Sequence, residues 1–222
     1  MSDIEFGIEV SGDFACFTRP EMKAERFSYH VITPSAARAV FEAILWKPAI
    51  QWKITRIEVM NPIKFMNIKR NEINHTISPR AVSLAMKNNK TDVGVDSACS
   101  KNRMQRHSVI LKDVRYRIFG KILLTNKMGL RDNYNKFADT FSRRLKAGKC
   151  FYQPYLGCRE FSAHFKEIEN LDEMPIQKTE DFGITLLDLD FTNSEKPSPL
   201  FYDTKMVNGV INVPNRVIPG II

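Results

Sequence analysis

The feature that most constrains the fold is a run of alternating apolar and basic residues between positions 108 and 124. The apolar members share one parity, namely Ile110, Val114, Tyr116, Ile118 and Ile122. The basic members Arg115, Arg117 and Lys121 share the other. Because successive side chains of a strand point to opposite faces, the run predicts a long strand or bent ribbon with an apolar back and a basic front. Such a front suits the phosphates of an RNA, and the alternative is a strand face exposed only to solvent.

The segments before this run alternate between strand and helix patterns. Residues 4–10 place apolar residues at every second position, which predicts a strand. The pair Thr33-Pro34 can start a helix, because threonine caps the first N–H groups and proline at the first position loses no hydrogen bond. Lys47-Pro48 ends that helix. Residues 50–60 predict a second strand, and its apolar face changes near Thr55, which indicates a bulge.

The segments after the run predict one more helix and several short strands. Apolar residues at helical spacing predict a helix from about Asn133 to Ala147, and Gly148 is a natural stop. Short strands are expected near 159–165, 182–191 and 207–213, with a turn at Asn208-Gly209.

This order predicts an α+β fold. We expect a ferredoxin-like (RRM-like) βαββαβ domain over residues 1–165, with a polar loop at about 86–102. A small β-rich extension is expected over residues 166–222. A ferredoxin-like fold carries many functions, so the fold alone assigns none.

Charge and cysteine usage narrow the class of protein. Lys and Arg outnumber Asp and Glu by 33 to 25, and the net charge of +8 favours a polyanionic partner. The four cysteines, Cys16, Cys99, Cys150 and Cys158, form no C-x-x-C pair, so we expect no metal site and no cofactor. The start of the chain lacks a signal-peptide pattern, and no stretch approaches about 18 apolar residues. We therefore expect a cytoplasmic protein with reduced thiols and no membrane association.

Several segments, taken in order, resemble one family of CRISPR-associated proteins, the type I-C (Dvulg-subtype) fifth Cas family. The resemblance rests on residues 11–23, 28–38 running into 44–48, 102–106 before 111–116, and 143–151 continuing through 157–161. These segments lie within roughly residues 4–165, and the rest of the chain matches only loosely. The joint match is specific, and it argues against a generic RNA-recognition domain or a DNA-binding protein outside CRISPR systems.

The resemblance implies a metal-independent endoribonuclease. Members of the family cut precursor guide RNA within its repeats, with the ribose 2′-OH attacking the adjacent phosphate, and stay on the 5′ handle in the Cascade complex. The implied partners are the repeat hairpin, the 5′ handle, and the backbone and large subunits of Cascade. Double-stranded DNA is a further candidate partner.

The family's catalytic pattern is incomplete in this chain. The family's pattern has a Tyr just before the Trp-Lys-Pro element, and this chain has Leu45 at that position. The pattern also has a Lys-His pair early in the second helix, and in this chain Lys136 is followed by Phe137. We therefore expect Lys136 alone to carry a catalytic role, and Leu45 and Phe137 to pack in the core. Four further candidates for the missing catalytic roles are Tyr29, His30, His107 and Tyr134. For each of them, a structural or solvent-facing role is the alternative that we favour. The alternative is a handle-binding subunit whose nuclease activity is weak or lost.

Two basic clusters are expected to bind RNA. Arg103 and Arg106, with Lys101 close by, precede the long strand. The second cluster surrounds the end of the later helix and contains Arg143, Arg144, Lys146 and Lys149. Such side chains neutralise phosphates, and arginine also stacks on bases. Trp46 and Phe151 either stack on RNA bases or pack in the core.

Overall fold

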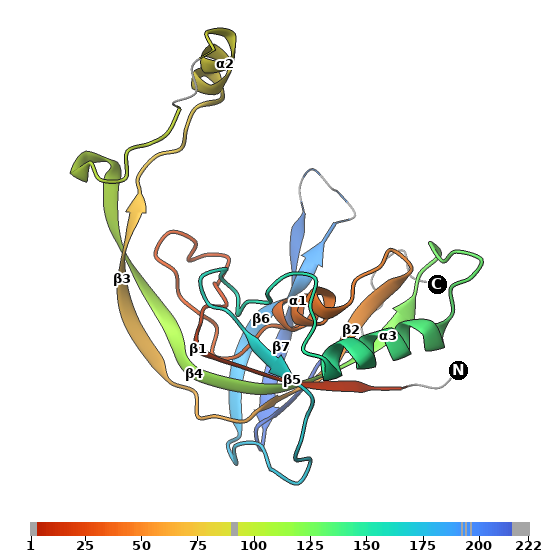
Figure 1. Ribbon diagram of the computed structural model, residues 1–222. Helices are drawn as coiled ribbons and strands as arrows, with labels where there is room; N and C mark the ends of the chain where they lie inside the picture. The colour runs from red at the N-terminus through yellow and green to blue at the C-terminus, as the bar shows by residue number, and fades with distance from the viewer. Residues whose placement is uncertain (1–3, 90–92, 192, 194, 196, 215–222) are drawn as a thin grey trace.

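The structure is a computed structural model that describes residues 4–89, 93–191, 193, 195 and 197–214. Its strands are β1 (Phe6–Ala15), β2 (Ile50–Val59), β3 (Phe65–Ile73), β4 (Arg103–Leu124), β5 (His164–Lys166), β6 (Glu180–Asp190), β7 (Ser198–Val207) and β8 (Val210–Asn212). Its helices are α1 (Pro34–Ile44), α2 (Pro79–Lys87) and α3 (Tyr134–Lys146), with a short 3-10 turn η1 (Ser100–Asn102). The predicted α+β class is confirmed as a mixed fold built on a curled antiparallel sheet (Figure 1).

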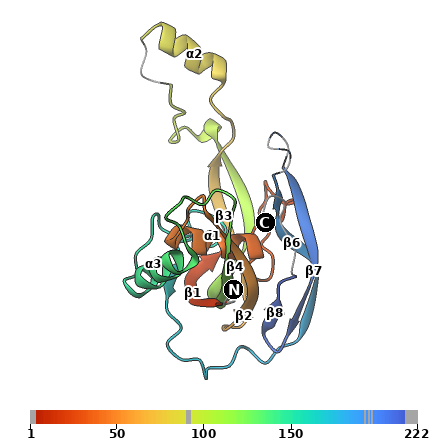
Figure 2. The same cartoon turned by 90° about the vertical axis from the view of Figure 1, so that its right-hand side faces the viewer.

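The sheet runs in the order β5-β1-β4-β2-β8-β7-β6, and β3 pairs with β4 beside this path. The short strand β8 joins the edge of β2, so β6 and β7 belong to the same sheet as the N-terminal strands. In Figure 2, α3 lies on one side of β1, β4 and β2, and β6 and β7 lie on the other side. The expected division at residue 165 falls within β5 and stays a prediction.

Local sequence signals explain where several elements begin, bend and turn. The Thr33 side chain accepts a hydrogen bond from the N–H of Ala36 and caps α1, as predicted. The register of β2 against β4 shifts between Ile54 and Arg56, which confirms the bulge. Asn208-Gly209 joins β7 to β8 with positive φ at both residues, the conformation that this pair favours in a tight hairpin turn.

The long strand β4 begins earlier than its apolar pattern predicted, at Arg103. Its first half pairs with β3, and the two strands rise together as a curved ribbon with α2 at its tip, which we call the arm (residues 65–111; Figure 1). The expected polar loop at 86–102 lies at this tip, between the end of α2 and η1, and its residues 90–92 lie outside the described residues. We did not predict β3, because exposed and half-buried residues alternate along it and no core selects apolar side chains.

Aromatic side chains form the core between the sheet and the helices α1 and α3. The ring of Trp52 lies 4.7 Å from that of Phe41 and 4.5 Å from that of Phe141, measured between centroids. Phe41 and Phe141 stack at 5.5 Å. This packing holds α1 beside α3 on the sheet, so the position of each helix depends on the other.

The face of β4 that points away from the helices was expected to be a basic front, and the structure contradicts this prediction. Arg117 is only 2% exposed, and its guanidinium donates to the carbonyl oxygens of Asn170 and Glu173 at 2.6 Å each. Arg115 donates to the buried carboxylate of Glu9 at 3.0 Å. The segment after β5 thus covers this face, and the two arginines hold the protein together instead of presenting an RNA platform. The alternative, a strand face exposed only to solvent, is also wrong for these two arginines, whereas the third member of the expected front, Lys121, is half-buried.

Candidate nucleic-acid interface

The C-terminal end of α1 forms one side of the candidate site. Beyond Ile44 the chain turns away from the helix, and the Leu45 carbonyl accepts a hydrogen bond from the Trp52 indole N–H at 2.8 Å. This bond fixes the turn, so that Leu45 points into the core. The next two side chains are turned outward, and Trp46 is 59% exposed. A large aromatic ring and the cation of Lys47 therefore stand together on the surface.

The loop after α3 forms the other side. Gly148 adopts a positive φ of 61° and ends the helix as predicted. The N–H of Phe151 then donates to the Ala43 carbonyl at 2.7 Å, which ties the loop to the last turn of α1. Phe151 is left 85% exposed and Tyr152 45% exposed. The structure therefore favours the expectation that Trp46 and Phe151 are available for stacking over the expectation that they pack in the core.

A groove lies between these two sides, and we call it the α1–α3 groove. Its lining side chains are Glu42, Trp46, Lys47, Pro48, Arg144, Phe151 and Tyr152. Arg144 donates to the Ile44 carbonyl at 2.8 Å, so its cation caps the negative end of α1 while facing the groove. Aromatic rings beside cations are the elements with which proteins hold single-stranded nucleic acid.

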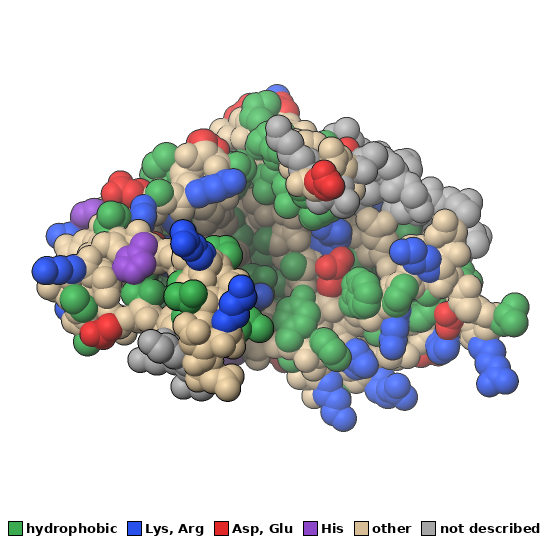
Figure 3. Space-filling view, turned by 90° about the horizontal axis from the view of Figure 1, so that it is seen from above, with side chains coloured by type: hydrophobic (Ala, Val, Ile, Leu, Met, Phe, Trp, Pro, Cys, Tyr) green, Lys and Arg blue, Asp and Glu red, His purple; other side chains and the backbone are tan. Residues whose placement is uncertain are grey.

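The predicted basic cluster of α3 lies beside this groove. Arg143, Lys146 and Lys149 are exposed, whereas Arg144 is half-buried. In Figure 3, several Lys and Arg side chains gather along the edge of the molecule on which α3 lies. Arg144 thus lines the groove with the exposed aromatic rings, and the other three residues are exposed at the same end of α3 and in the loop that follows.

Lys136 lies in the first turn of α3, at the other end of the helix from Arg144. Its ammonium group forms an ion pair with the Asp132 carboxylate at 2.9 Å, and its side chain is 54% exposed. The hydrogen bond from Lys136 lowers the pKa of Asp132, and the N–H of Gly129 and the nearby Lys47 lower it further. Lys47, which lines the α1–α3 groove, is therefore close enough to Asp132 for its charge to act on that carboxylate.

The two arginines predicted on the arm are in different environments. Arg103 is exposed and donates to the Ala98 carbonyl at 3.2 Å. Arg106 pairs with the Glu72 carboxylate at 3.2 Å, and Arg70 shares that carboxylate at 2.9 Å. The structure therefore separates the cluster into one exposed cation and one that is already paired.

Both departures from the family's catalytic pattern lie in the core. Leu45 is fully buried, and Phe137 is buried on the inner face of α3. Their expected role in core packing is confirmed.

The other polar candidates lie in several different places. Tyr29 is buried under the Arg19 guanidinium, His30 stacks on Phe182, and the hydroxyl of Tyr134 donates to the Ile4 carbonyl at 3.4 Å. His107 is exposed on the arm.

Sequence reasoning missed Glu42, Lys47 and Tyr152 as members of a site. The Trp-Lys-Pro element and the aromatic loop after Gly148 were visible in the sequence, but nothing indicated that they face one another.

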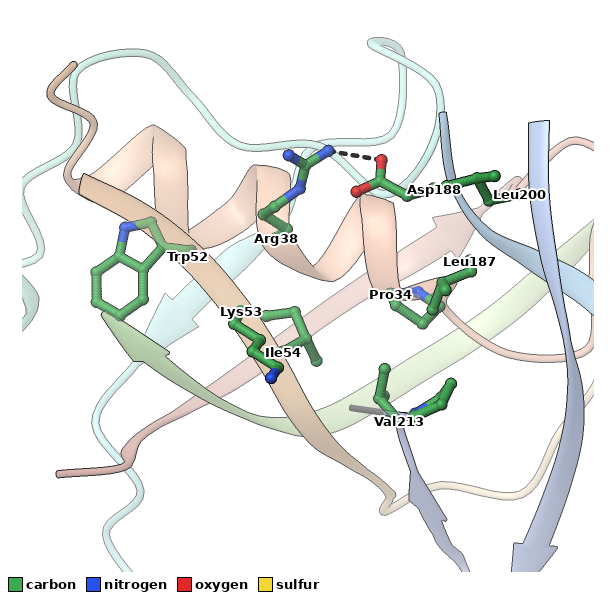
Figure 4. A pocket seen from close by; sticks show the side chains of 10 residues that line it. Pro34, Arg38, Trp52, Lys53, Ile54, Leu187, Asp188, Leu200 and Val213 are labelled. Atoms are coloured by element: carbon green, nitrogen blue, oxygen red, sulfur yellow. Dashed lines mark hydrogen bonds and ion pairs between the residues drawn. The ribbon is translucent and has the colours of Figure 1, made fainter. Parts of the chain in front are cut away.

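A second, mostly apolar pocket lies between α1, β2 and the strands β6 and β7 (Figure 4). At its rim the Arg38 guanidinium meets the Asp188 carboxylate at 2.7 Å.

Among the described residues, no group of three or more His, Cys, Asp or Glu side chains is placed to hold a metal ion, and no helix is long and apolar enough to cross a membrane.

Comparison with known proteins gives consistent matches over almost the whole chain. The Cas5d family model, described as CRISPR-associated protein (Cas_Cas5), matches residues 7–214. A protein of Mannheimia succiniciproducens named CRISPR pre-crRNA endoribonuclease Cas5d is 44% identical over 213 residues, which cover 93% of this chain and 93% of that protein. A protein of the same name from Thermus thermophilus is 34% identical over 225 residues, covering 93% of this chain and 90% of that protein.

Two solved structures share the fold. A crystal structure of a CRISPR-associated protein superposes with a TM-score of 0.68 at 21% identity, covering 96% of this chain and 92% of that one. A functionally uncharacterized protein from Streptococcus mutans superposes with a TM-score of 0.66 at 21% identity, covering 96% of this chain and 93% of that one.

Proposed function

Because this chain belongs to the Cas5d family of CRISPR-associated proteins, we propose that it is an endoribonuclease that cuts precursor CRISPR RNA within the repeats. The two curated relatives carry the name of that activity, and the matches span nearly their whole lengths. After cutting, the protein stays on the 5′ handle of the product. The observation that carries this proposal is the α1–α3 groove, where the exposed rings of Trp46 and Phe151 stand beside Lys47 and Arg144.

The proposed chemistry needs no metal ion. The ribose 2′-OH attacks the neighbouring phosphate, the 5′-oxygen leaves, and the products carry a 2′,3′-cyclic phosphate and a 5′-hydroxyl. Negative charge grows on the phosphoryl oxygens in the transition state, and a cation held nearby stabilises it. Lys136 is the proposed catalytic cation, because its ion pair with Asp132 holds the ammonium group in place while leaving it accessible.

The binding surface is proposed to continue along α3 and up the arm. Arg143, Arg144, Lys146 and Lys149 contact phosphates beside the groove, and Arg103 with Arg106 contacts the part of the repeat that reaches the arm. Neutralising phosphates in this way releases condensed counterions, so affinity should fall steeply with salt.

A finer description of the fold is also part of the proposal. The order β5-β1-β4-β2, with α1 after β1 and α3 after β4, supports a ferredoxin-like unit over residues 1–165. Residues 166–222 are the β-rich extension, which closes the basic side of β4 and contributes β6 to β8.

The proposed partners are the repeat hairpin, its 5′ handle, and the backbone and large subunits of a Cascade complex in the cytoplasm. Exposed apolar side chains on α2, Leu84 and Met86, support a protein neighbour at the tip of the arm. Double-stranded DNA stays a candidate partner, and competition between a DNA duplex and the repeat hairpin would test it.

A second candidate function is handle binding with weak or no cleavage. The burial of Leu45 and Phe137 favours it, because two positions of the family's catalytic pattern hold apolar side chains that face the core. Neither side chain can reach a phosphate from there.

One cleavage assay separates the two functions. The purified protein is incubated in EDTA with a labelled repeat hairpin and, in parallel, with a hairpin that carries a 2′-deoxy group at the scissile nucleotide. The Lys136→Ala variant is compared with Lys205→Ala, a matched change of an exposed lysine on β7. We expect one cut that the 2′-deoxy substitution and Lys136→Ala abolish and Lys205→Ala leaves unchanged. Tight binding of the hairpin without any cut would refute the endoribonuclease and establish the handle-binding subunit.

A further inference from the structure

We propose that Glu42 and Tyr152 supply the general base and the general acid for RNA cleavage in the α1–α3 groove. This inference rests on the proposed endoribonuclease function and names the two proton-transfer groups that the chain otherwise lacks. It assigns catalytic roles to residues that lie outside the family's incomplete pattern at Leu45 and Phe137.

The groove brings a carboxyl and a phenol together from two segments. Glu42 lies in the last turn of α1, and Tyr152 lies in the loop after α3. The hydrogen bond from the Phe151 N–H to the Ala43 carbonyl, at 2.7 Å, joins the backbones of these segments next to both side chains. Tyr152 is close enough to Glu42 for the carboxylate to act on the ionisation of the phenol. Both groups therefore face the same space beside Arg144.

The surroundings of Glu42 leave its carboxyl free for proton transfer. Arg38 is its nearest cation at 3.7 Å, but the same guanidinium makes a much shorter contact of 2.7 Å with Asp188 (Figure 4). Burial raises the pKa of Glu42, Arg38 opposes the rise, and Asp188 adds to it. A carboxylate whose pKa is raised is a better base than an ordinary one.

Tyr152 has the complementary property. Burial raises the pKa of its phenol, and the charge of Glu42 and the neighbouring Tyr155 raise it further. The phenol consequently keeps its proton at neutral pH, which a general acid requires. Because it is still 45% exposed, it can reach a bound substrate.

The cations of the same groove can stabilise the developing charge on the phosphate. Arg144 and Lys47 line it together with Glu42 and Tyr152. Lys47 is also close enough to Asp132, the partner of Lys136, for its charge to act on that carboxylate. Trp46 and Phe151 line the same groove and can hold the bases on either side of the scissile bond.

The step balances without any further reactant. The Glu42 carboxylate takes the proton of the 2′-OH as the 2′-oxygen bonds to phosphorus. The bond from phosphorus to the 5′-oxygen breaks, and Tyr152 donates its proton to that oxygen. The enzyme is left with a neutral Glu42 and a Tyr152 phenolate, and exchange of one proton through solvent restores both.

Single-turnover cleavage of the repeat hairpin by Glu42→Gln and Tyr152→Phe tests the assignment. Each variant should cut roughly 100- to 10,000-fold more slowly than the parent protein, because each removes one proton-transfer group. Both should bind the 2′-deoxy hairpin with unchanged affinity and keep the parent's circular dichroism and melting temperature. The matched controls are Glu21→Gln, an exposed carboxylate, and Tyr202→Phe, a phenol on β7, and both should cut like the parent.

Two further readouts assign the roles. The parent's rate should rise with pH up to the raised pKa of Glu42 and then level off, and Glu42→Gln should lose that rise. A hairpin with a bridging sulfur at the 5′ position of the scissile bond needs no acid, since sulfur leaves without a proton. It should restore Tyr152→Phe to the parent's rate and leave Glu42→Gln slow.

The outcomes separate this inference from the function on which it rests. If the parent protein cuts and either variant cuts within threefold of it, the acid-base assignment is overturned and the endoribonuclease stands. If the parent makes no cut in any condition, both are overturned.

Discussion

Replacing Arg117 with methionine tests the role that the structure gives to the basic residues of β4. The guanidinium is almost completely buried, and it donates to two carbonyl oxygens of the segment that covers the sheet, those of Asn170 and Glu173, at 2.6 Å each. It also lies 3.8 Å from the Glu9 carboxylate and 3.1 Å from that of Glu173. Methionine replaces the apolar stem of the side chain and removes the charge and every donor.

The expected cost follows from what the change leaves unpaired. Removing one partner of a buried ion pair typically costs about 3 to 5 kcal/mol, because the remaining polar groups stay buried. Arg115 still pairs with Glu9 at 3.0 Å in the variant, so we expect the lower end of that range. For a protein of this size, about 3 kcal/mol corresponds to a fall in melting temperature of roughly 6 to 12 °C.

Thermal unfolding followed by circular dichroism measures this effect. The control is Lys112→Met, which removes an exposed cation from the same strand and should leave the melting temperature within error. Below its transition, Arg117→Met should bind the repeat hairpin like the parent protein, because Arg117 cannot reach RNA. A variant that melts within 2 °C of the parent and loses RNA affinity would refute our account and restore the basic front as a binding platform.

Three more predictions, which use five substitutions, test the binding surface and the core. Trp46→Ala and Phe151→Ala should each weaken repeat binding by about 1 to 3 kcal/mol per stacked base, roughly 5- to 150-fold in Kd. Neither change should alter the melting temperature. An unchanged Kd in the binding titrations would show that the rings do not contact the RNA. Arg103→Ala should lower the slope of log Kd against log salt concentration by about 1. Arg106→Ala should change that slope less, because Glu72 already pairs with the Arg106 cation. Equal slopes for the two variants would contradict this distinction. Phe141→Ala should lower the free energy of unfolding by about 3 to 5 kcal/mol, as measured by denaturant titration, because the ring is fully buried against Phe41 and Trp52. A loss below about 1 kcal/mol would mean that the core collapses around the gap.

Elements that depend on neighbouring residues were predictable from the sequence. The cap of α1 at Thr33, the bulge near Thr55, the end of α3 at Gly148 and the turn at Asn208-Gly209 each involve contacts within a few residues. The long strand was predictable because its apolar face is buried against the helices. β3 gave no comparable signal, since it lies on an arm that no core covers.

The candidate site divides in the same way. The four basic residues at the end of α3 share a surface because they are neighbours in one helix and the loop that follows. Lys136 and Asp132 are only four residues apart at the start of α3, so their ion pair is local as well. The α1–α3 groove has no such local origin, because it requires α1 and the loop after α3, about 100 residues apart in the chain, to lie side by side.

Charge gives the clearest contrast between sequence and fold. The alternation along β4 determines that Arg115 and Arg117 share a face, because the geometry of a strand is local. Whether that face meets water, RNA or protein depends on where a distant segment packs. The carbonyls of Asn170 and Glu173 reach Arg117 only after the chain has passed through α3 and β5, and no pattern within either segment records the contact. Most of the helices and strands thus follow from short-range preferences, whereas the burial of Arg117 and the open groove follow from long-range packing of the chain.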